Sequence, residues 1–335
     1  MTYRLFSVQL VIRYPEAPQA GPEPDGDTVK FLPDDPAGVA DLARAGGVEP
    51  GFSSLHRISL RLEGIDALET HFAGTHQELG LARAARDHLL AALGFRDVVF
   101  DPQRPDQVRS ANADRLPGWV LSNGLDAHGR LVAFLFCGPA PRPEGAEVFL
   151  TAEQMAASVN VDLLRIGLVY PMLYTSLPVD LREPLAAVAA AARAAGLGLW
   201  PRSTADPGSA ADLSGPAGPL PALRELVIWP KLFRRLVSFL AAGNGDLSGF
   251  EGWLQDNPAA RDDPLVLLPS GEPARLHQVL TVGTDGTLAL TRWPETIVVL
   301  PATWIQGQGS TAAASSSYRS ISATLAADGD AGSNR

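Results

Sequence analysis

Five charged residues in the first half of the sequence could together carry out chemistry on a phosphate group: Asp27, Arg61, Asp66, Glu69 and Arg130. Two aspartates and a loop carbonyl would offer the hard oxygen ligands that Ca²⁺ and Mg²⁺ prefer. Two arginines can each donate paired hydrogen bonds to one phosphate. The remaining carboxylate could activate a water molecule. These residue types are the equipment for phosphodiester hydrolysis, provided that the fold brings them together.

The most concentrated part of this set is the stretch from Arg61 to Glu69. Apolar and polar residues alternate there, which predicts a half-buried β-strand over residues 57–65 with Arg61 on its polar face. The strand is expected to end at Gly64, and Asp66 and Glu69 follow in a loop. Carboxylates at close range repel each other when no positive charge neutralises them. A bound cation would explain why a strand ends in such a loop.

The overall charge limits how a polyanion could bind. The 335 residues include 27 basic and 37 acidic side chains, for a net charge of −10, and only Lys30 and Lys231 are lysines. A protein of this charge does not hold nucleic acid by general electrostatic attraction, so any favourable field must be local to the site. The hydrophobic content of 46% is ample for one large domain or two smaller ones.

Two further features concern the cellular compartment. Cys137 is the only cysteine, which excludes an internal disulfide and a cysteine-based zinc site. The N-terminal stretch alternates like a strand and lacks the apolar core of a signal peptide. No apolar run approaches the roughly 18 residues of a membrane span. We therefore expect a cytoplasmic protein that does not contact a membrane.

The elements expected up to residue 202 are strands followed by helices, with one hairpin between them. Strands are predicted over residues 6–12, 26–31, 57–65, 98–100, 119–121 and 130–136. Helices are predicted over residues 78–93, 151–166 and 180–195, the last two opened by capping boxes at Thr151 and Asp180. Residues 126–129 form a turn, and residues 33–54 read as a surface insertion. The fold class is α+β.

The remainder of the chain reads as a separate part. Residues 203–220 are rich in Pro, Gly and Ser and are predicted to be a linker. Residues 221–303 are expected to form a small α+β module, with a helix over 223–241 and strands over 264–268, 276–282, 286–291 and 296–300. Residues 304–335 are predicted to be disordered. The module could mediate homo-oligomerisation or recruit a protein partner, for example in defence or repair.

Five ordered motifs resemble the staphylococcal-nuclease-like (thermonuclease) family over about residues 3–202. The matching segments are Asp25-Gly-Asp27-Thr-Val-Lys, Arg61-Leu-x-Gly-Ile-Asp66-x-x-Glu69, Gly129-Arg130-Leu-Val-Ala-Phe, Val159-Asn160-x-x-Leu163-Leu-Arg-x-Gly167 and an Ala-rich helix ending in Gly-Leu-Trp200. The resemblance implies an OB-fold five-stranded β-barrel with three helices. It also implies a Ca²⁺-dependent endonuclease that cuts DNA and RNA with little sequence specificity and leaves 3′-phosphates.

The same resemblance assigns roles to individual residues. Asp27 and Asp66 would bind Ca²⁺, or Mg²⁺ or another divalent cation, with help from the carbonyl of Ala67. Glu69 would be the general base or would position the water. The arginines Arg61 and Arg130 would bind the scissile phosphate and stabilise the transition state. Two tyrosines are candidates for stacking on a nucleotide base, namely Tyr170 and Tyr174.

Each of these residues also has a simpler interpretation when taken alone. Asp27 could belong to an ordinary Asp-Gly turn, and Asp66 and Glu69 could cap a helix. Arg61 and Arg130 could be solvated charges. Their joint occurrence in the family order favours a nuclease centre. The alternative from another functional class is a nucleic-acid-binding or scaffolding module on the same fold.

Overall fold

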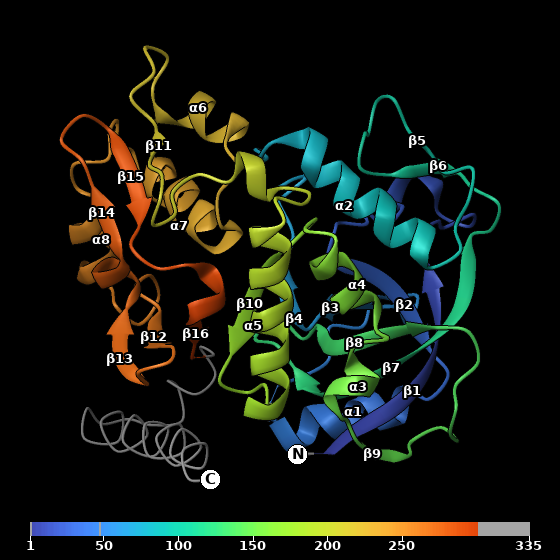
Figure 1. The fold of residues 1–335 in the computed structure, drawn as a ribbon. Helices are drawn as coiled ribbons and strands as arrows, with labels where there is room; N and C mark the ends of the chain where they lie inside the picture. Colours follow the sequence, from blue (N-terminus) through green and yellow to red (C-terminus); the bar gives the residue numbers. More distant parts are fainter. Residues whose placement is uncertain (1, 47, 301–335) are drawn as a thin grey trace, which may run out of the picture. The chain divides into compact units, whose positions relative to one another are not determined.

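The structure is a computed structural model that describes residues 2–46 and 48–300 (Figure 1). Its contacts divide the chain into two compact units. The first unit comprises Met1–Pro171 and Pro178–Arg202, and the second comprises Met172–Leu177 and the chain from Ser203 onward. The tail predicted to be disordered, residues 304–335, lies outside the described residues.

The first unit is built on a closed β-barrel of five strands. These strands are β1 (Thr2–Val11), β2 (Thr28–Pro33), β3 (Ile58–Leu62), β7 (Arg115–Leu125) and β8 (Leu131–Cys137). Their order is β2-β3-β8-β7-β1, and β1 closes the barrel by pairing with β2 (Figure 1). All neighbours are antiparallel except β3 and β8, which are parallel. A closed mixed barrel of this kind, covered by helices, is consistent with an OB fold.

The alternation of side chains explains which face of each strand is buried. In β3, Ile58, Leu60 and Leu62 are buried, whereas Ser59 and Arg61 are partly exposed. The predicted placement of Arg61 on the polar face is therefore confirmed. In β2, Val29 and Phe31 point inward in the same way. Because strand side chains alternate with a period of two, Thr28, Lys30, Ser59 and Arg61 share the outer face of the barrel.

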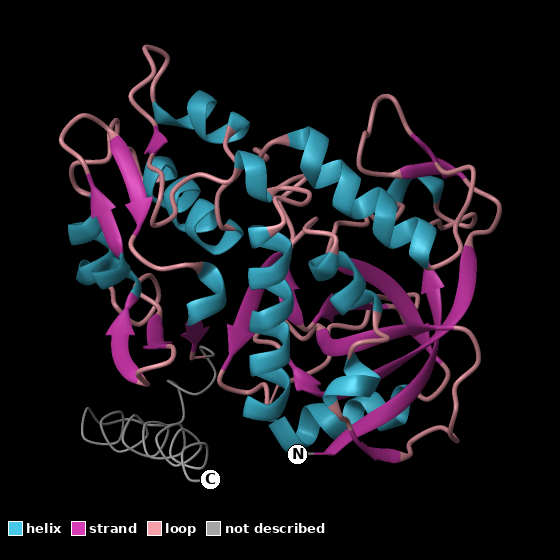
Figure 2. Ribbon diagram, viewed as in Figure 1, coloured by secondary structure: helices cyan, strands magenta, loops and turns pink. Residues whose placement is uncertain are grey.

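Five helices accompany the barrel. They are α1 (Pro36–Gly46), α2 (Leu79–Ala92), α3 (Ala152–Met155), α4 (Val159–Arg165) and α5 (Val179–Ala194). Helix α4 packs against β8, α2 and α5 (Figure 2). The helix predicted over residues 78–93 is confirmed as α2, which begins where the Glu78 carboxylate accepts a hydrogen bond from the Leu81 amide at 2.7 Å.

The other two helix predictions were wrong in detail. The helix predicted over residues 151–166 is two helices, because Ser158 accepts a bond from the Val161 amide and starts a second one. The capping box at Thr151 is present, but it opens only α3. Helix α5 begins after Pro178 with no side-chain cap, so Asp180 lies inside its first turn rather than at the predicted cap. An acidic residue in the first turn still interacts favourably with the positive end of the helix dipole.

Shorter elements decorate the barrel. The segment predicted as a surface insertion, residues 33–54, contains α1 and a loop whose Gly51 amide donates to the Gly129 carbonyl at 2.9 Å. The insertion therefore contacts the turn that precedes Arg130. The remaining short elements of this unit are β4 (Gly64–Asp66), β5 (Val99–Phe100), β6 (Val108–Ser110), β9 (Glu147–Phe149) and the 3₁₀ helices η1 (Pro18–Ala20) and η2 (Trp200–Arg202).

The second unit is a mixture of helices and short strands. Its helices are α6 (Pro219–Glu225), α7 (Pro230–Ala241), α8 (Phe250–Asp256), η3 (Leu276–Val279) and η4 (Pro294–Thr296). Its strands are β11 (Ala211–Asp212), β12 (Pro264–Leu267), β13 (Glu272–Arg275), β14 (Leu280–Val282), β15 (Thr287–Leu290) and β16 (Ile297–Val299), with β16 also pairing in parallel with the end of β10 (Tyr170–Tyr174).

Pro230 explains why one helix expected in the second unit is divided in two. The helix predicted over residues 223–241 is divided into α6 and α7, and the second of these starts at Pro230, which lacks the amide proton a continuous helix needs. The predicted linker, residues 203–220, contains the paired strand β11 and the buried Ala211. Among the residues described, no helix combines the length and apolar character needed to cross a bilayer.

Asn160 ties the helical layer of the first unit to the barrel. Its side chain is fully buried, and its Oδ1 accepts a hydrogen bond from the Leu135 amide at 2.9 Å. Its Nδ2 donates to the carbonyls of Glu63 at 2.9 Å and Ala133 at 3.0 Å. One amide on α4 therefore satisfies three backbone groups, two in β8 and one at the end of β3. Such groups are costly to bury without partners.

We expect Asn160→Ala to lower the free energy of unfolding by about 3–5 kcal/mol, because three buried backbone groups each lose a hydrogen bond. Urea denaturation of the full chain measures this loss. Asn112→Ala is the matched control, since Asn112 also bonds to backbone groups, of Arg96 and Gly94, but is exposed. That variant should lose less than about 1 kcal/mol. Equal losses in the two variants would contradict the bridging role of Asn160.

Candidate functional site

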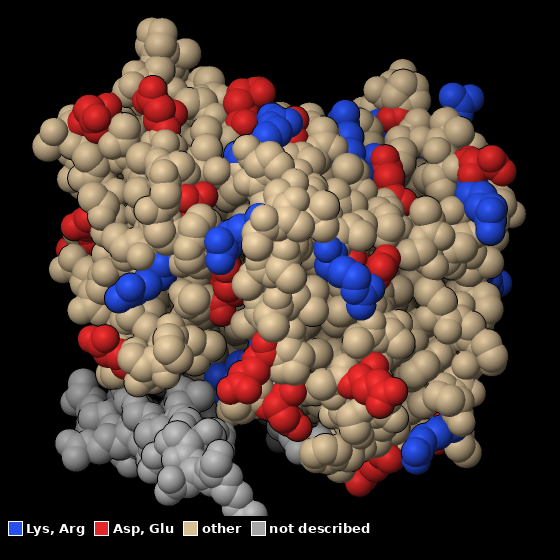
Figure 3. Space-filling model, viewed as in Figure 1, with Lys and Arg blue, Asp and Glu red and all other residues tan. Residues whose placement is uncertain are grey.

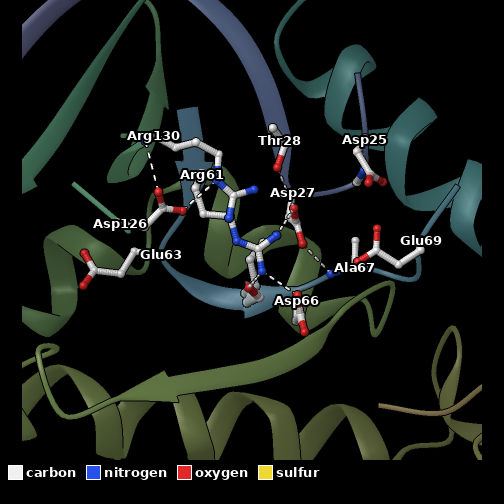
Figure 4. Close-up of polar contacts among 12 residues, drawn as sticks. Asp25, Asp27, Thr28, Arg61, Glu63, Asp66, Ala67, Glu69, Asp126 and Arg130 are labelled. Atoms are coloured by element: carbon white, nitrogen blue, oxygen red, sulfur yellow. Dashed lines mark hydrogen bonds and ion pairs between the residues drawn. The ribbon is translucent and has the colours of Figure 1, made fainter. Parts of the chain in front are cut away.

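A double ion pair lies at the centre of the candidate site. The Arg61 guanidinium contacts Asp27 through Nη1 and Asp66 through Nη2, and Nη2 also donates to the Ile65 carbonyl at 3.3 Å (Figure 4). The side chains of Asp27 and Asp66 are 3% and 0% exposed, and that of Arg61 is 14% exposed. Charges this deeply buried must be paired, because an isolated ion would lose its hydration without compensation. Both carboxylates share Arg61, whose single positive charge offsets one of the two negative charges.

The pairing of β2 with β3, together with one backbone hydrogen bond, places Asp27 beside Arg61. Thr28 lies directly opposite Arg61 in the β2–β3 pair, and the Leu62 amide donates to the Asp27 carbonyl at 2.9 Å. The second carboxylate oxygen of Asp27 accepts from the Ala67 amide at 2.7 Å, and the Thr28 hydroxyl donates to the first at 2.9 Å. Asp27 therefore joins the start of β2 to the loop that follows β4.

Two glycines allow the chain to follow this path. A Cβ atom on Gly26 would lie 2.6 Å from the Cβ of Ala67, so only glycine fits between β2 and the loop. Gly64 has a φ of +81°, a conformation that side chains with a Cβ rarely adopt. It turns the backbone between β3 and β4 and delivers Asp66 to the guanidinium.

Arg130 reaches the site from the turn that precedes β8. Figure 4 shows its side chain beside that of Arg61, on the side away from Glu69. Its Nε donates to the Asp126 carboxylate at 2.6 Å, and its backbone amide donates to the same carboxylate at 3.0 Å. About a third of the Arg130 side chain is exposed. The turn residue Asp126 thus holds Arg130 by both its backbone and its side chain.

Glu69 lies on the opposite side of Asp27, next to Ala67 and facing Asp25 (Figure 4). Its backbone exchanges hydrogen bonds with Gln77, through the side chain at 3.1 Å and the amide at 2.9 Å, so the two ends of the loop are fastened together. Loss of water around Asp25, followed by the charges of Asp27 and Glu69, raises the pKa of the Asp25 carboxyl well above its ordinary value. The acidic side of the site is therefore crowded with negative charge.

The structure thus brings six of the predicted residues to one end of the barrel. Asp27, Arg61, Asp66 and Ala67 are in direct contact, with Glu69 and Arg130 on either side. Ala67 contributes its amide to Asp27 in this arrangement.

The two predicted tyrosines belong to different units. Tyr170 is 1% exposed and packs edge to face on Trp200, with ring centroids 5.2 Å apart. Its ring is part of the core and does not present a face to a nucleotide. Tyr174 is partly buried and belongs to the second unit. Trp200 is buried as well.

A divalent cation can be tested against these donors. Among the described residues, no group of three or more His, Cys, Asp or Glu side chains has the arrangement of a metal site. Two buried carboxylates nevertheless face a single positive group from two sides. Carboxylate oxygens are the ligands that Ca²⁺ and Mg²⁺ prefer, so the chemistry of the donor set fits such a cation.

Neither the protein-family models nor the curated proteins with which the chain was compared match it. The likeness to staphylococcal-nuclease-like proteins therefore depends on the five sequence motifs and on the closed barrel.

Surface charge does not form a large basic region on the face drawn in Figure 3. Basic and acidic side chains are scattered there and mixed with one another. This mixture agrees with the net charge of −10.

Sequence reasoning missed two residues that shape the site. Asp126 orients Arg130, and its position four residues earlier in the same turn was the available signal. Glu63, which directly follows β3, points away from the ion pair (Figure 4). It is 6% exposed, and its Oε2 has no hydrogen-bond partner among the described residues.

Burial raises the pKa of Glu63 to about 8, although the neighbouring Tyr3 opposes the rise. Between the ordinary glutamate pKa of 4.5 and this value, the folded protein retains a proton that the unfolded chain has released. The free energy of unfolding therefore decreases as pH rises through this window, and the full penalty is present above about pH 8.

We expect Glu63→Gln to remove this penalty and to raise the free energy of unfolding near pH 8 by on the order of 3 kcal/mol. The difference from wild type should vanish below the ordinary glutamate pKa, where both forms are neutral. Urea denaturation at a series of pH values measures it. The exposed Glu147→Gln is the matched control and should change little at any pH. A constant difference across the series would show that Glu63 does not titrate in this way.

Proposed function

We propose that the protein is a metal-dependent nuclease of the staphylococcal-nuclease-like type, which hydrolyses phosphodiester bonds in DNA and RNA with little sequence specificity. The observation that carries this proposal is the convergence of two buried carboxylates on Arg61, with Arg130 and Glu69 on either side of them. A purely structural ion pair would need one carboxylate for one arginine. Here two carboxylates contact the one guanidinium of Arg61, and a third, that of Glu69, lies beside them.

The arginines are the groups that would bind the phosphate. A guanidinium is planar and donates hydrogen bonds in a fork that matches two phosphate oxygens. The Nε of Arg130 donates to Asp126. The two terminal nitrogens of the guanidinium would then be the ones that bind a phosphate. Arg61 and Arg130 would stabilise the charge that builds on phosphorus as a water molecule attacks.

Asp27 and Asp66 would hold the divalent cation, with the carbonyl of Ala67 as a further oxygen donor. When bound, such a cation supplies positive charge that polarises a phosphoryl oxygen. The amide bond from Ala67 and the hydroxyl of Thr28 keep the Asp27 carboxylate in place for this role. The nearly complete burial of Asp66 limits how far its oxygens can move.

Glu69 would act as the general base or would position the attacking water. Its backbone is fastened to Gln77, whereas its side chain is partly exposed and lies beside the buried carboxylates. A general base must reach the proton that it removes, and Glu69 lies at the rim of the site, where a water molecule can approach.

Replacement of the proposed general base, Glu69, or of the phosphate-binding Arg130 should stop cleavage while the protein remains folded. We expect Glu69→Gln and Arg130→Ala each to lower the rate of plasmid cleavage in Ca²⁺ by at least about 100-fold, because each removes a group that acts on the transition state. Agarose gels of plasmid DNA and RNA, run with Ca²⁺, Mg²⁺ or a chelator, measure this loss. Arg142→Gln, which changes an exposed arginine in another loop, is the matched control. Cleavage that persists in the chelator would contradict the metal assignment.

Metal binding can be measured without any nucleic acid. We expect Ca²⁺ to raise the thermal unfolding temperature of the wild type and to do so much less in Asp27→Asn, because a ligand that binds only the folded state stabilises it. Differential scanning calorimetry gives the shift for each variant. Asp34→Asn serves as the control, since Asp34 is an exposed aspartate at the other end of β2. An equal shift in all three proteins would place the cation elsewhere.

A second candidate is a nucleic-acid-binding module that does not cleave. The observation that favours it is that Arg61 contacts both carboxylates, so the same groups that would bind a cation and a phosphate also bind each other. The cleavage assay separates the two functions. If the wild type and Glu69→Gln both leave DNA intact but retard it in a gel, the binding function is favoured.

A further inference from the structure

Lys30 is a cation on the outer face of the barrel that the proposed catalytic set does not use. It lies on β2, two residues beyond Thr28, and is directly opposite Ser59 on β3. Its Nζ donates to the Ser59 hydroxyl at 2.7 Å. Among the described residues, no carboxylate lies within ion-pair distance of it. The other lysine, Lys231, is paired with Asp263 at 2.8 Å.

A second cation, Arg130, lies near Lys30 on the same face of the barrel. Leu60 pairs with Leu131 in the parallel β3–β8 pair, so Arg130 falls level with Ser59, one residue earlier on each strand. Lys30 on β2, Ser59 on β3 and Arg130 directly before β8 therefore form one row. Adjacent strands lie about 4.8 Å apart, which places the backbones of the two cations about 10 Å apart.

The electrostatics of the row agree with this geometry. Partial burial, followed by the positive charge of Arg130, lowers the pKa of Lys30 from its ordinary value. The Asp126 carboxylate offsets one of these two positive charges, which leaves a net positive charge that an anion could neutralise. The residue between them is the small Ser59, so both long side chains can reach one strip of surface.

We infer that Lys30 binds a second phosphate of the same nucleic acid strand, next to the phosphate held by Arg61 and Arg130. This inference rests on the proposed function and names the substrate class more narrowly. The preferred ligand is a polynucleotide with at least two consecutive phosphates, rather than a mononucleotide diester. The strand would run along the row, from Arg130 across Ser59 to Lys30.

The test is the binding of a fluorescent oligothymidylate to the full chain, measured by anisotropy over a range of salt concentrations in the presence of a chelator. Each phosphate contact to a single strand adds about 0.7 to the slope of log affinity against log salt. We expect Lys30→Gln to lower that slope by about this amount and to weaken binding about fivefold near 0.1 M salt. Lys30→Arg should retain wild-type behaviour.

Two further variants separate the effect of Lys30 from a general effect of surface charge. Ser59→Asp would supply the carboxylate that Lys30 lacks, and it should weaken binding as Lys30→Gln does. Arg142→Gln removes one exposed charge from another loop and should leave the slope unchanged. A mononucleotide with one phosphate, used as a competitor, should displace the oligothymidylate from wild type and Lys30→Gln with the same inhibition constant.

Several outcomes would overturn the inference. Lys30→Gln could bind with the wild-type slope, or Arg142→Gln could lower the slope equally, or the mononucleotide could lose as much affinity as the oligothymidylate. Failure of the wild type to bind any oligothymidylate would also overturn it. Cleavage plays no part in these measurements. If the protein binds as expected but cuts nothing with any divalent cation, the proposed function fails and the role of Lys30 stands.

Discussion

The guanidinium of Arg61, placed between two buried carboxylates, organises one end of the barrel. Asp27 belongs to the start of β2, Arg61 to β3 and Asp66 to the short strand after it, so one cation joins three segments. Without that cation, two negative charges would remain in a site that excludes water, which is strongly unfavourable. The charge balance of this end of the fold and its proposed chemistry therefore depend on the same side chain.

The remaining positions follow from the way in which the barrel closes. The parallel pairing of β3 with β8 brings the turn before β8 to the row that begins in β2, although these segments are about 100 residues apart in the sequence. Asn160 then fixes the helical layer to the same two strands by satisfying their backbone groups. Side chains that could bind phosphate or a cation thus lie on strands whose spacing is set by backbone hydrogen bonds.

Much of this arrangement could be predicted from local patterns. The alternation around Arg61 gave its strand and its face, and the glycines at positions 94 and 129 marked the end of a helix and a turn, as their positive φ angles confirm. The division of residues 151–166 at Ser158 could not be predicted as readily, because the apolar spacing continues across the break. The pairing of Arg61 with both aspartates and the burial of Tyr170 depend on contacts between distant segments, which no local pattern encodes. Sequence spacing therefore located the charged residues but not their partners.

The contact between the insertion and the turn at Gly129 has a consequence for how the chain can vary. A Cβ atom on Gly129 would lie 2.6 Å from the carbonyl of Glu49 and 2.7 Å from the amide of Gly51, so the two backbones approach as closely as they can. A loop of different length or path at residues 49–51 would leave this approach unfilled or blocked. The insertion therefore adds a second constraint at Gly129, whose φ of +73° already favours glycine. A relative without the insertion would lose the steric constraint and keep the conformational one.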